Sequence, residues 1–171
     1  MKKILVVIDM QKDFVTGSLG TKEAQAIVPA VVEKVKSYIS EGWDVIFTRD
    51  THQENYLLTA EGKKLPVEHC IRDTKGWQII DELQPFAKEI MDKPSFGSLE
   101  LAKDLFEKGY ETIELIGVCT DICVVSNALI IKAQMPECNV SVDAACCAGV
   151  TVASHEAALT TMGMCQVDIL K

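Results

Sequence analysis

Short apolar runs alternate along the whole chain with longer stretches in which apolar residues recur at helical spacing. Residues 4–8 are Ile-Leu-Val-Val-Ile, an uninterrupted and mostly β-branched run that is typical of a strand buried on both faces. Further segments with strand character are 44–48, 89–91, 112–118, 139–142 and 167–170. Segments with helical spacing or composition are 26–39, 77–86, 99–108, 121–133 and 154–164.

Strands that alternate with helices in this way predict an α/β fold. We expect a single-domain, three-layer, Rossmann-like arrangement over residues 1–171, with a six-stranded, mostly parallel sheet flanked by helices. Residues 50–76 are polar and irregular, and they are too long for a simple connection. This segment is therefore predicted to be a functional loop or a lid.

Composition and charge narrow the range of partners. The 171 residues are 48% hydrophobic and 25% charged, which is typical of a globular domain with a full core. The 25 acidic and 17 basic residues leave a formal net charge of −8. Such a chain is not expected to hold nucleic acid or an anionic membrane over a broad basic face, although a local cation can still hold a small ligand. No segment approaches the roughly 20 apolar residues needed to cross a membrane.

The cysteine content is high for this length. The seven cysteines are Cys70, Cys119, Cys123, Cys138, Cys146, Cys147 and Cys165. Their spacing includes no Cys-x-x-Cys pair, and no secretory signal is visible near residue 1. An odd number of cysteines without an export signal predicts free thiols in a reducing, cytoplasmic setting.

The carboxyl ends of parallel strands lie at one edge of a sheet, where ligands of such folds bind. Asp9 follows the first predicted strand, Lys93 the third, and the segment that contains Cys123 the fourth. Thr120 or Asp121 is expected to cap the next helix, which would place Cys123 in its first turn. The helix N-terminus and Lys93 are then expected to lower the pKa of the Cys123 thiol.

Each of these residues also has a purely structural interpretation. Taken alone, Cys123 is more often a buried core thiol, Asp9 a turn residue or helix cap, and Lys93 a solvated surface residue. The combination of an acid, a lysine and a cysteine at one sheet edge is more specific than any one of them. It favours a nucleophilic site.

A second group of polar residues lies in the irregular segment. Asp50 and His52 are two residues apart, so their side chains share one side of an extended segment, and His69 follows in the same loop. Two histidines and a carboxylate are suited to a divalent metal with open coordination positions. The alternative is that His52 caps a loop and His69 lies on the surface. His155 is expected on a helix surface.

Three segments together resemble the isochorismatase-like cysteine hydrolases, and the resemblance extends over essentially the whole chain. Residues 9–14, Asp-Met-Gln-Lys-Asp-Phe, with Gly17 and Leu19, are similar to the D-x-Q-x-D-F motif of that family. Residues 92–94, Asp-Lys-Pro, with Phe96, are similar to its lysine motif. Residues 117–124, Gly-Val-Cys-Thr-Asp-Ile-Cys-Val, are similar to its nucleophile motif.

The resemblance implies a catalytic triad of Asp9, Lys93 and Cys123. It also implies a cis peptide bond between Val118 and Cys119, with the N–H groups of Cys119 and Cys123 in an oxyanion hole. Within the family, the nicotinamidase branch is the most similar. That branch implies a divalent metal, zinc by preference, held by Asp50, His52 and His69, with Glu61 as a further candidate ligand.

The same branch implies a pyridine amide as substrate, with the metal at the ring nitrogen and Phe14 as one wall of the pocket. The sequence departs from it in two places. The aromatic residue usual before the later metal histidine is Leu65 here, or is displaced to Trp77, and residues 51–56 lack the usual tryptophan and second histidine. Cys123 disfavours the vinyl ether chemistry of isochorismatase itself.

We therefore expect a cysteine-dependent amidohydrolase that converts nicotinamide to nicotinate and ammonia through a thioester, acts on a small-molecule amide and forms a homo-oligomer. One alternative is a metal-independent hydrolase of another small amide or a ureido or carbamoyl compound. Another is a catalytically silent binding or oligomeric module on the same fold.

Overall fold

A computed structural model describes residues 1–171. Its six strands are β1 (Lys3–Ile8), β2 (Asp44–Asp50), β3 (Ile90–Lys93), β4 (Thr112–Val118), β5 (Asn139–Ala148) and β6 (Asp168–Leu170). Its α-helices are α1 (Lys12–Val15), α2 (Lys22–Ser40), α3 (Ala60–Lys64), α4 (Leu99–Glu107), α5 (Val125–Gln134) and α6 (Val152–Met164). Short 3₁₀ turns are η1 (Tyr56–Leu58) and η2 (Gln84–Phe86), and a π-helical turn, η3, spans Thr120–Val124.

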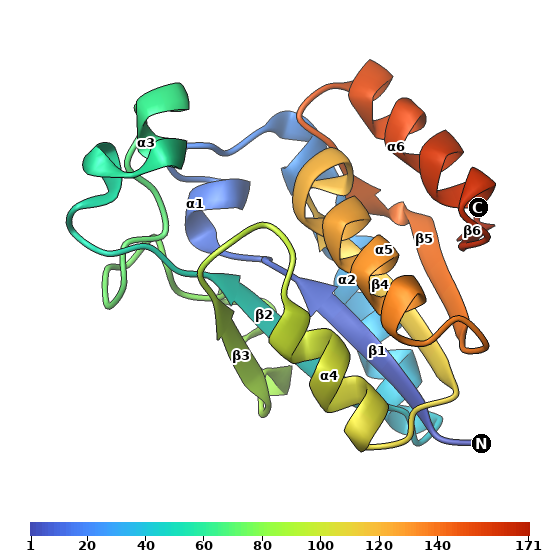
Figure 1. Cartoon of the computed structure of the whole chain (residues 1–171). Coiled ribbons are helices and arrows are strands. Elements are labelled where there is room, and N and C mark those ends of the chain that lie inside the picture. The colour runs from blue at the N-terminus through green and yellow to red at the C-terminus, as the bar shows by residue number, and fades with distance from the viewer.

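The strands form one sheet in the order β3-β2-β1-β4-β5-β6, and every neighbouring pair is parallel (Figure 1). The predicted α/β class with a six-stranded sheet is thus confirmed. All strands run in one direction, so their carboxyl ends meet at the same edge. No helix is both long and apolar enough to cross a membrane.

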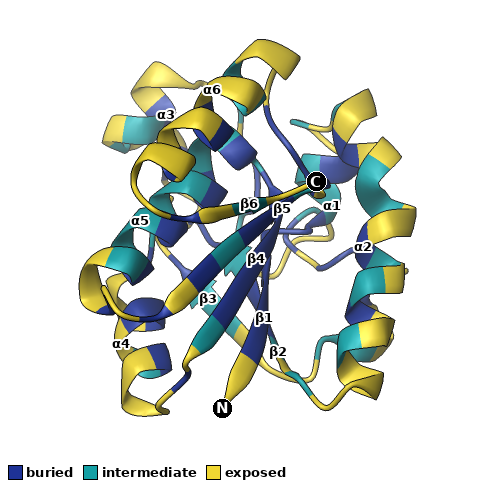
Figure 2. Cartoon of the chain, turned by 90° about the vertical axis from the view of Figure 1, so that its right-hand side faces the viewer, coloured by how far each residue is buried: buried dark blue, intermediate teal, exposed yellow.

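The side chains of β1 alternate between two apolar layers, as the pleat of a strand requires. Ile4, Val6 and Ile8 pack in the layer that includes residues of α4, α5 and α6. Leu5 and Val7 point the other way, into the layer that includes residues of α2. Figure 2 shows the result: α2 lies on one side of the sheet, and α4, α5 and α6 lie on the other.

The helix predicted over residues 77–86 is wrong, because only η2 is helical there. The first part of this segment bonds through its backbone to the turn after β1. Ile80 donates to the carbonyl of Met10, Lys12 donates to the carbonyl of Gln78, and Gln11 forms an antiparallel bridge with Ile79. This pairing between distant segments brings the loop after β2 against the end of β1.

Strand β5 is longer than predicted. It continues to Ala148, because Cys147 and Ala148 pair with Gly117 and Val118 of β4 beyond an irregularity in the register. The irregular segment after β2 contains η1 and α3, neither of which was predicted. The predicted cap at Thr120 or Asp121 is also wrong: Cys119 is the N-cap of η3, and its side chain makes no capping bond.

Candidate active site

The sheet brings Asp9, Lys93 and Cys123 together from three separate segments. Asp9 immediately follows β1, Lys93 is the last residue of β3, and Cys123 lies in η3 after β4. Asp9 and Lys93 are fully buried, and Cys123 is 4% exposed. Residues more than 100 positions apart in the sequence therefore share one buried space.

Lys93 lies between the acid and the thiol. Its Nζ is 2.6 Å from Oδ2 of Asp9 and 3.5 Å from Sγ of Cys123. The same nitrogen donates to the carbonyl of Ser95 at 3.1 Å. The other carboxylate oxygen of Asp9 accepts a 2.6 Å hydrogen bond from the hydroxyl of Thr48. The geometry places one cation within reach of two groups that can each carry a negative charge.

Burial has a large effect on the protonation of all three side chains. It raises the pKa of Asp9, and the attraction of Lys93 offsets only part of that rise. Burial also raises the pKa of the Cys123 thiol well above its ordinary value, and the nearby charge of Asp9 adds to the effect more than Lys93 subtracts. The lowered thiol pKa expected from the sequence is therefore wrong for the resting site. Burial lowers the pKa of Lys93, but the negative charges of Asp9, Cys123 and Asp50 together outweigh burial, so the net pKa is raised.

The turn that carries Cys123 has an unusual backbone. The Val118–Cys119 peptide is cis, as the resemblance implied. Gly117, just before it, has φ of +117°, and a Cβ there would lie 2.1 Å from the carbonyl oxygen of Ile8. The carbonyl of Cys119 accepts from the N–H groups of Ile122 and Val124. The N–H of Cys119 itself has no partner of this kind and remains available to an oxyanion.

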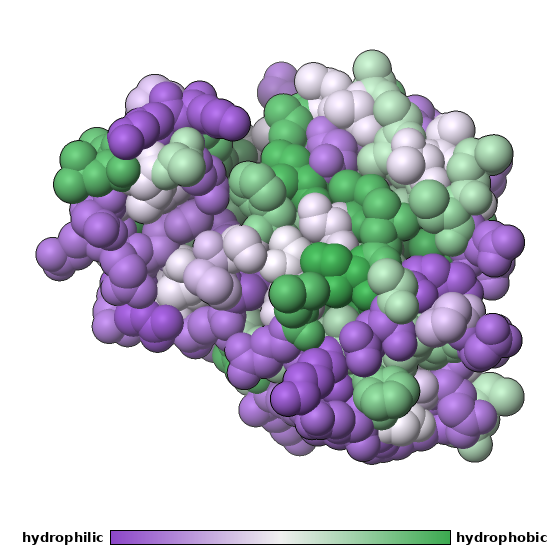
Figure 3. All heavy atoms as spheres, viewed as in Figure 1, coloured by the Kyte–Doolittle hydropathy of each residue, from purple (hydrophilic) through white to green (hydrophobic).

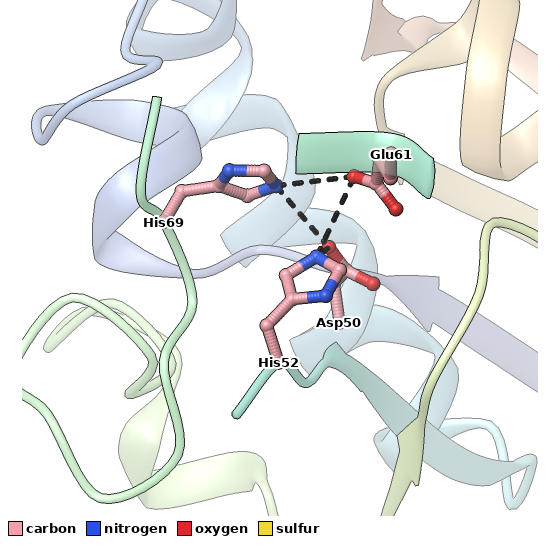
Figure 4. Close-up of side chains that lie close together, drawn as sticks. All are labelled: Asp50, His52, Glu61 and His69. Atoms are coloured by element: carbon pink, nitrogen blue, oxygen red, sulfur yellow. Dashed lines mark hydrogen bonds and ion pairs between the residues drawn. The ribbon is translucent and has the colours of Figure 1, made fainter. Parts of the chain in front are cut away.

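The second predicted group also converges. Asp50, His52, Glu61 and His69 each present a ligand atom, and these atoms lie within 4.8 Å of one another. As Figure 4 shows, the two Nε2 atoms and two carboxylate oxygens point toward one centre. Nε2 of His52 lies 2.9 Å from Oδ2 of Asp50 and 3.5 Å from Oε1 of Glu61. Nε2 of His69 lies 3.6 Å from each of those oxygens.

This donor set suits a divalent transition metal. Nδ1 of His69 is 2.8 Å from the carbonyl of Val67, which favours the tautomer with its hydrogen there and leaves Nε2 free to ligate. Imidazole nitrogens and carboxylate oxygens are both ligands that zinc takes in proteins. Burial raises the pKa of Asp50, but the hydrogen bonds with His52 and His69 and the nearby charges of Lys93 and His52 together outweigh burial, so the net pKa lies below the ordinary range. The carboxylate is thus ready to ligate.

The side chain of Gln11, close to Asp9 in the sequence, holds the backbone of Asp50 in the second group of ligands. It is fully buried; its side-chain oxygen accepts from the N–H of Asp50 at 2.7 Å, and its side-chain nitrogen donates to the carbonyl of Asp50 at 2.9 Å. Asp50 is also the neighbour of Lys93 across β2 and β3. Nearby, Asp13 accepts from the N–H of Cys70 at 2.8 Å and so anchors the residue after His69. The D-x-Q-x-D segment therefore supports both groups.

One cavity of about 260 Å³ opens onto both groups. Its twelve lining residues, eight of them hydrophobic, are Phe14, Leu19, Thr21, Asp50, Glu61, Leu65, His69, Phe96, Cys119, Ile122, Cys123 and Val150. Phe14 was predicted to form a wall. Thr21, Ile122 and Val150 were not predicted, because nothing in their sequence surroundings distinguishes a cavity wall from an ordinary helix start or loop.

Two histidines are less exposed than a surface interpretation of each would require. His69 is 3% exposed, so the alternative in which it lies on the surface is wrong. His155 is also not a simple surface residue: it is partly buried, and its Nδ1 lies 2.7 Å from the hydroxyl of Thr120.

Comparison with known proteins gives a consistent picture. Residues 3–170 match the model of the isochorismatase domain. A protein of Bacillus subtilis strain 168, described as an uncharacterized isochorismatase family protein PncA, is 32% identical over 143 residues, which span 75% of this chain and 78% of that protein.

Solved structures agree with this sequence match. A pyrazinamidase of Pyrococcus horikoshii in complex with zinc superposes with a TM-score of 0.87 and 28% identity, covering 100% of this chain and 99% of that one. A nicotinamidase/pyrazinamidase, PncA, from Bacillus subtilis superposes with a TM-score of 0.85 and 26% identity, covering all of both chains.

Proposed function

The chain belongs to the isochorismatase family, and we propose that it is a nicotinamidase-like amidohydrolase that converts nicotinamide to nicotinate and ammonia. One observation carries the proposal. A single, mostly apolar cavity has Cys123 with its Asp9–Lys93 pair on one side and the Asp50 and His69 donors on another. A flat aromatic amide has two polar ends that match these two sides.

The residues of the donor set would hold a divalent metal, and zinc is the one we propose. Asp50, His52 and His69 would be its protein ligands, with Glu61 as a fourth. When bound, the metal supplies a Lewis-acid contact to the pyridine nitrogen, which orients the ring in the cavity. Phe14, whose ring centroid is 5.5 Å from that of His69, would flank the ring.

The proposed chemistry starts with proton transfer from the Cys123 thiol to Asp9. The transfer moves a negative charge from the carboxylate to the sulfur, and Nζ of Lys93 is close to both atoms. The cation is therefore paired before and after the step, although both acids are buried. The sulfur attacks the amide carbon, and the developing oxyanion is held by the N–H groups of Cys119 and Cys123.

Collapse of the tetrahedral intermediate breaks the carbon–nitrogen bond. Asp9 returns its proton to the leaving nitrogen, so ammonia departs and a thioester to Cys123 remains. Water then loses a proton to Asp9 and attacks the thioester carbon. The carbon–sulfur bond breaks, the acid product is released, and the proton returns to the sulfur.

Ammonia release tests this proposal. The wild-type protein loaded with zinc is expected to release ammonia from nicotinamide, and Cys123→Ala is expected to reduce the rate to background. Cys147→Ala, a change at another buried cysteine outside the cavity, is the matched control and is expected to keep the wild-type rate. Activity in Cys123→Ala would contradict the assignment of the nucleophile. Activity that survives complete removal of the metal would contradict the role of the donor set.

The proposal also covers the localisation, the domain organisation and the oligomeric state of the protein. All seven cysteines are free thiols, which supports a reducing, cytoplasmic setting. The match of one family model to residues 3–170 supports a single domain over residues 1–171.

Figure 3 shows apolar side chains gathered across the middle of the face that carries α4 and α5, and exposed apolar residues of this region include Phe96, Leu99 and Phe106. Such a patch supports a homo-oligomer, which light scattering after gel filtration would detect as a mass above 18.8 kDa.

A further inference from the structure

A contact outside the cavity connects α6 to the turn that carries the nucleophile. Thr120 is the first residue of η3 and is fully buried. Its hydroxyl lies 2.7 Å from Nδ1 of His155, in the first turns of α6. The two residues are 35 positions apart, and α6 lies beside α5 in Figure 1. His155 is the only side chain that hydrogen bonds with the buried hydroxyl.

Thr120 occupies a sensitive place in the turn. It directly follows Cys119, whose N–H is available to an oxyanion, and it precedes Cys123 by three residues. A shift of Thr120 would move the peptide unit that it shares with Cys119, which contains the Cys119 carbonyl that accepts from the N–H groups of Ile122 and Val124 and so shapes the turn up to Cys123. The carboxylate of Asp121, the next residue, accepts from the N–H of Val150 at 3.1 and 3.2 Å. The turn is thus held at two consecutive residues, by α6 at Thr120 and by the segment before α6 at Asp121.

His155 has little freedom to move away from this contact. A Cβ added to Gly149 would lie 2.9 Å from Cβ of His155 and 3.1 Å from its Cα, so the backbone at Gly149 packs closely against this residue. On its outer side, His155 borders a separate cleft of about 240 Å³ that also includes Glu23 and Cys147. The backbone of His155 is therefore packed against the segment after β5, and its imidazole reaches from there to the nucleophile turn.

We propose that His155 is a positioning residue for the hydrolase reaction: its hydrogen bond to Thr120 holds the turn from Cys119 to Cys123 so that the backbone N–H groups face the oxyanion. This inference rests on the proposed function. His155 contacts neither the cavity nor Cys123 directly, so its effect on the reaction passes through Thr120. Either tautomer serves, because a hydroxyl can donate to a bare Nδ1 or accept from a protonated one.

Steady-state kinetics on nicotinamide provide the first test. Loss of an oxyanion donor lowers kcat about 10²–10³-fold, and a displaced donor costs less, so His155→Ala is expected to lower kcat roughly 10–100-fold. KM is expected to stay within about twofold, since the contact is to the reacting turn and not to the substrate. Asn places an amide near the position of Nδ1, so His155→Asn is expected to recover most of the rate. Glu156→Ala, at the exposed neighbour on α6, is the control.

Two further measurements separate positioning from loss of structure. Pyridine-3-carboxaldehyde adds its carbonyl carbon to the Cys123 sulfur, and its oxygen then occupies the oxyanion position, so its affinity is expected to fall in parallel with kcat. Alkylation of Cys123 by iodoacetamide uses no oxyanion and is expected to keep its rate. If both fall together in His155→Ala, the residue is merely structural and the inference is overturned.

Hydrogen exchange tests the contact without any substrate. The N–H groups of residues 119–124 are expected to exchange faster in His155→Ala than in the wild type, and at the wild-type rate in His155→Asn and Glu156→Ala. If the wild type hydrolyses no amide, the proposed function fails while this readout still decides the inference. Unchanged exchange in His155→Ala, or an unchanged kcat in an active enzyme, would overturn it.

Discussion

Replacing Lys93 by Met removes the buried cation while keeping most of the side-chain stem. Nζ of Lys93 is 2.6 Å from Asp9, 3.5 Å from Cys123 and 3.6 Å from Asp50, and neither Lys93 nor Asp9 is exposed. Removing one partner of a buried ion pair costs about 3–5 kcal/mol of unfolding free energy, because the other charge remains without a partner. Lys93→Met is therefore expected to destabilise the fold by an amount of that order near neutral pH.

The loss should shrink in acid, and the sign follows from the protonation of Asp9. Burial already raises the pKa of Asp9 in the folded state, and without Lys93 that pKa rises further. The folded variant then binds more protons than its unfolded form, whose aspartate titrates near about 4, so the unfolding free energy of the variant falls as pH rises above that value. Urea unfolding across the pH range measures this slope. A Lys93→Met protein with wild-type pH dependence would refute the reasoning.

Activity gives the second readout of the same change. A protonated Asp9 cannot accept the proton of Cys123, and loss of a general base costs about 10²–10⁴ in rate. Lys34→Met is the matched control, because Lys34 pairs with Glu114 and Asp143 away from the cavity. It is expected to lose stability but to keep kcat per folded molecule. If Lys93→Met kept more than a tenth of the wild-type kcat/KM, Lys93 would not be part of the proton transfer.

Three other outcomes are expected. The acid limb of kcat/KM should lie above the ordinary pKa of an aspartate, because burial raises the pKa of Asp9, and Thr48→Val should move it to still higher pH by removing a hydrogen bond that stabilises the carboxylate. Gln11→Ala should weaken zinc binding about 10–100-fold in a competition titration, since Gln11 holds the backbone of the ligand Asp50. Glu61→Gln should also weaken zinc binding, whereas the same change at exposed Glu54 should not; equal affinities would exclude Glu61 as a ligand.

Local signals were sufficient where a segment bonds mainly to itself or to its sequential neighbours. The strand β1 was visible because burial on both faces leaves an uninterrupted apolar run, and α4 was visible because burial of one helical face leaves a period in the sequence. Residues 77–86 had similar helical character, yet their backbone pairs with Met10, Gln11 and Lys12. That pairing depends on residues more than 60 positions away, so no local pattern could reveal it.

The sequence by itself determined which residues carry reactive or ligating groups, and the order of parallel strands indicated that Asp9, Lys93 and Cys123 share one edge of the sheet. Only the tertiary structure decided their protonation, because a pKa depends on burial and on charges brought in from other strands. It likewise decided that His155, expected on a helix surface, lies against Thr120. Such contacts join segments far apart in the chain, and the distance between two side chains is a property of the packed fold.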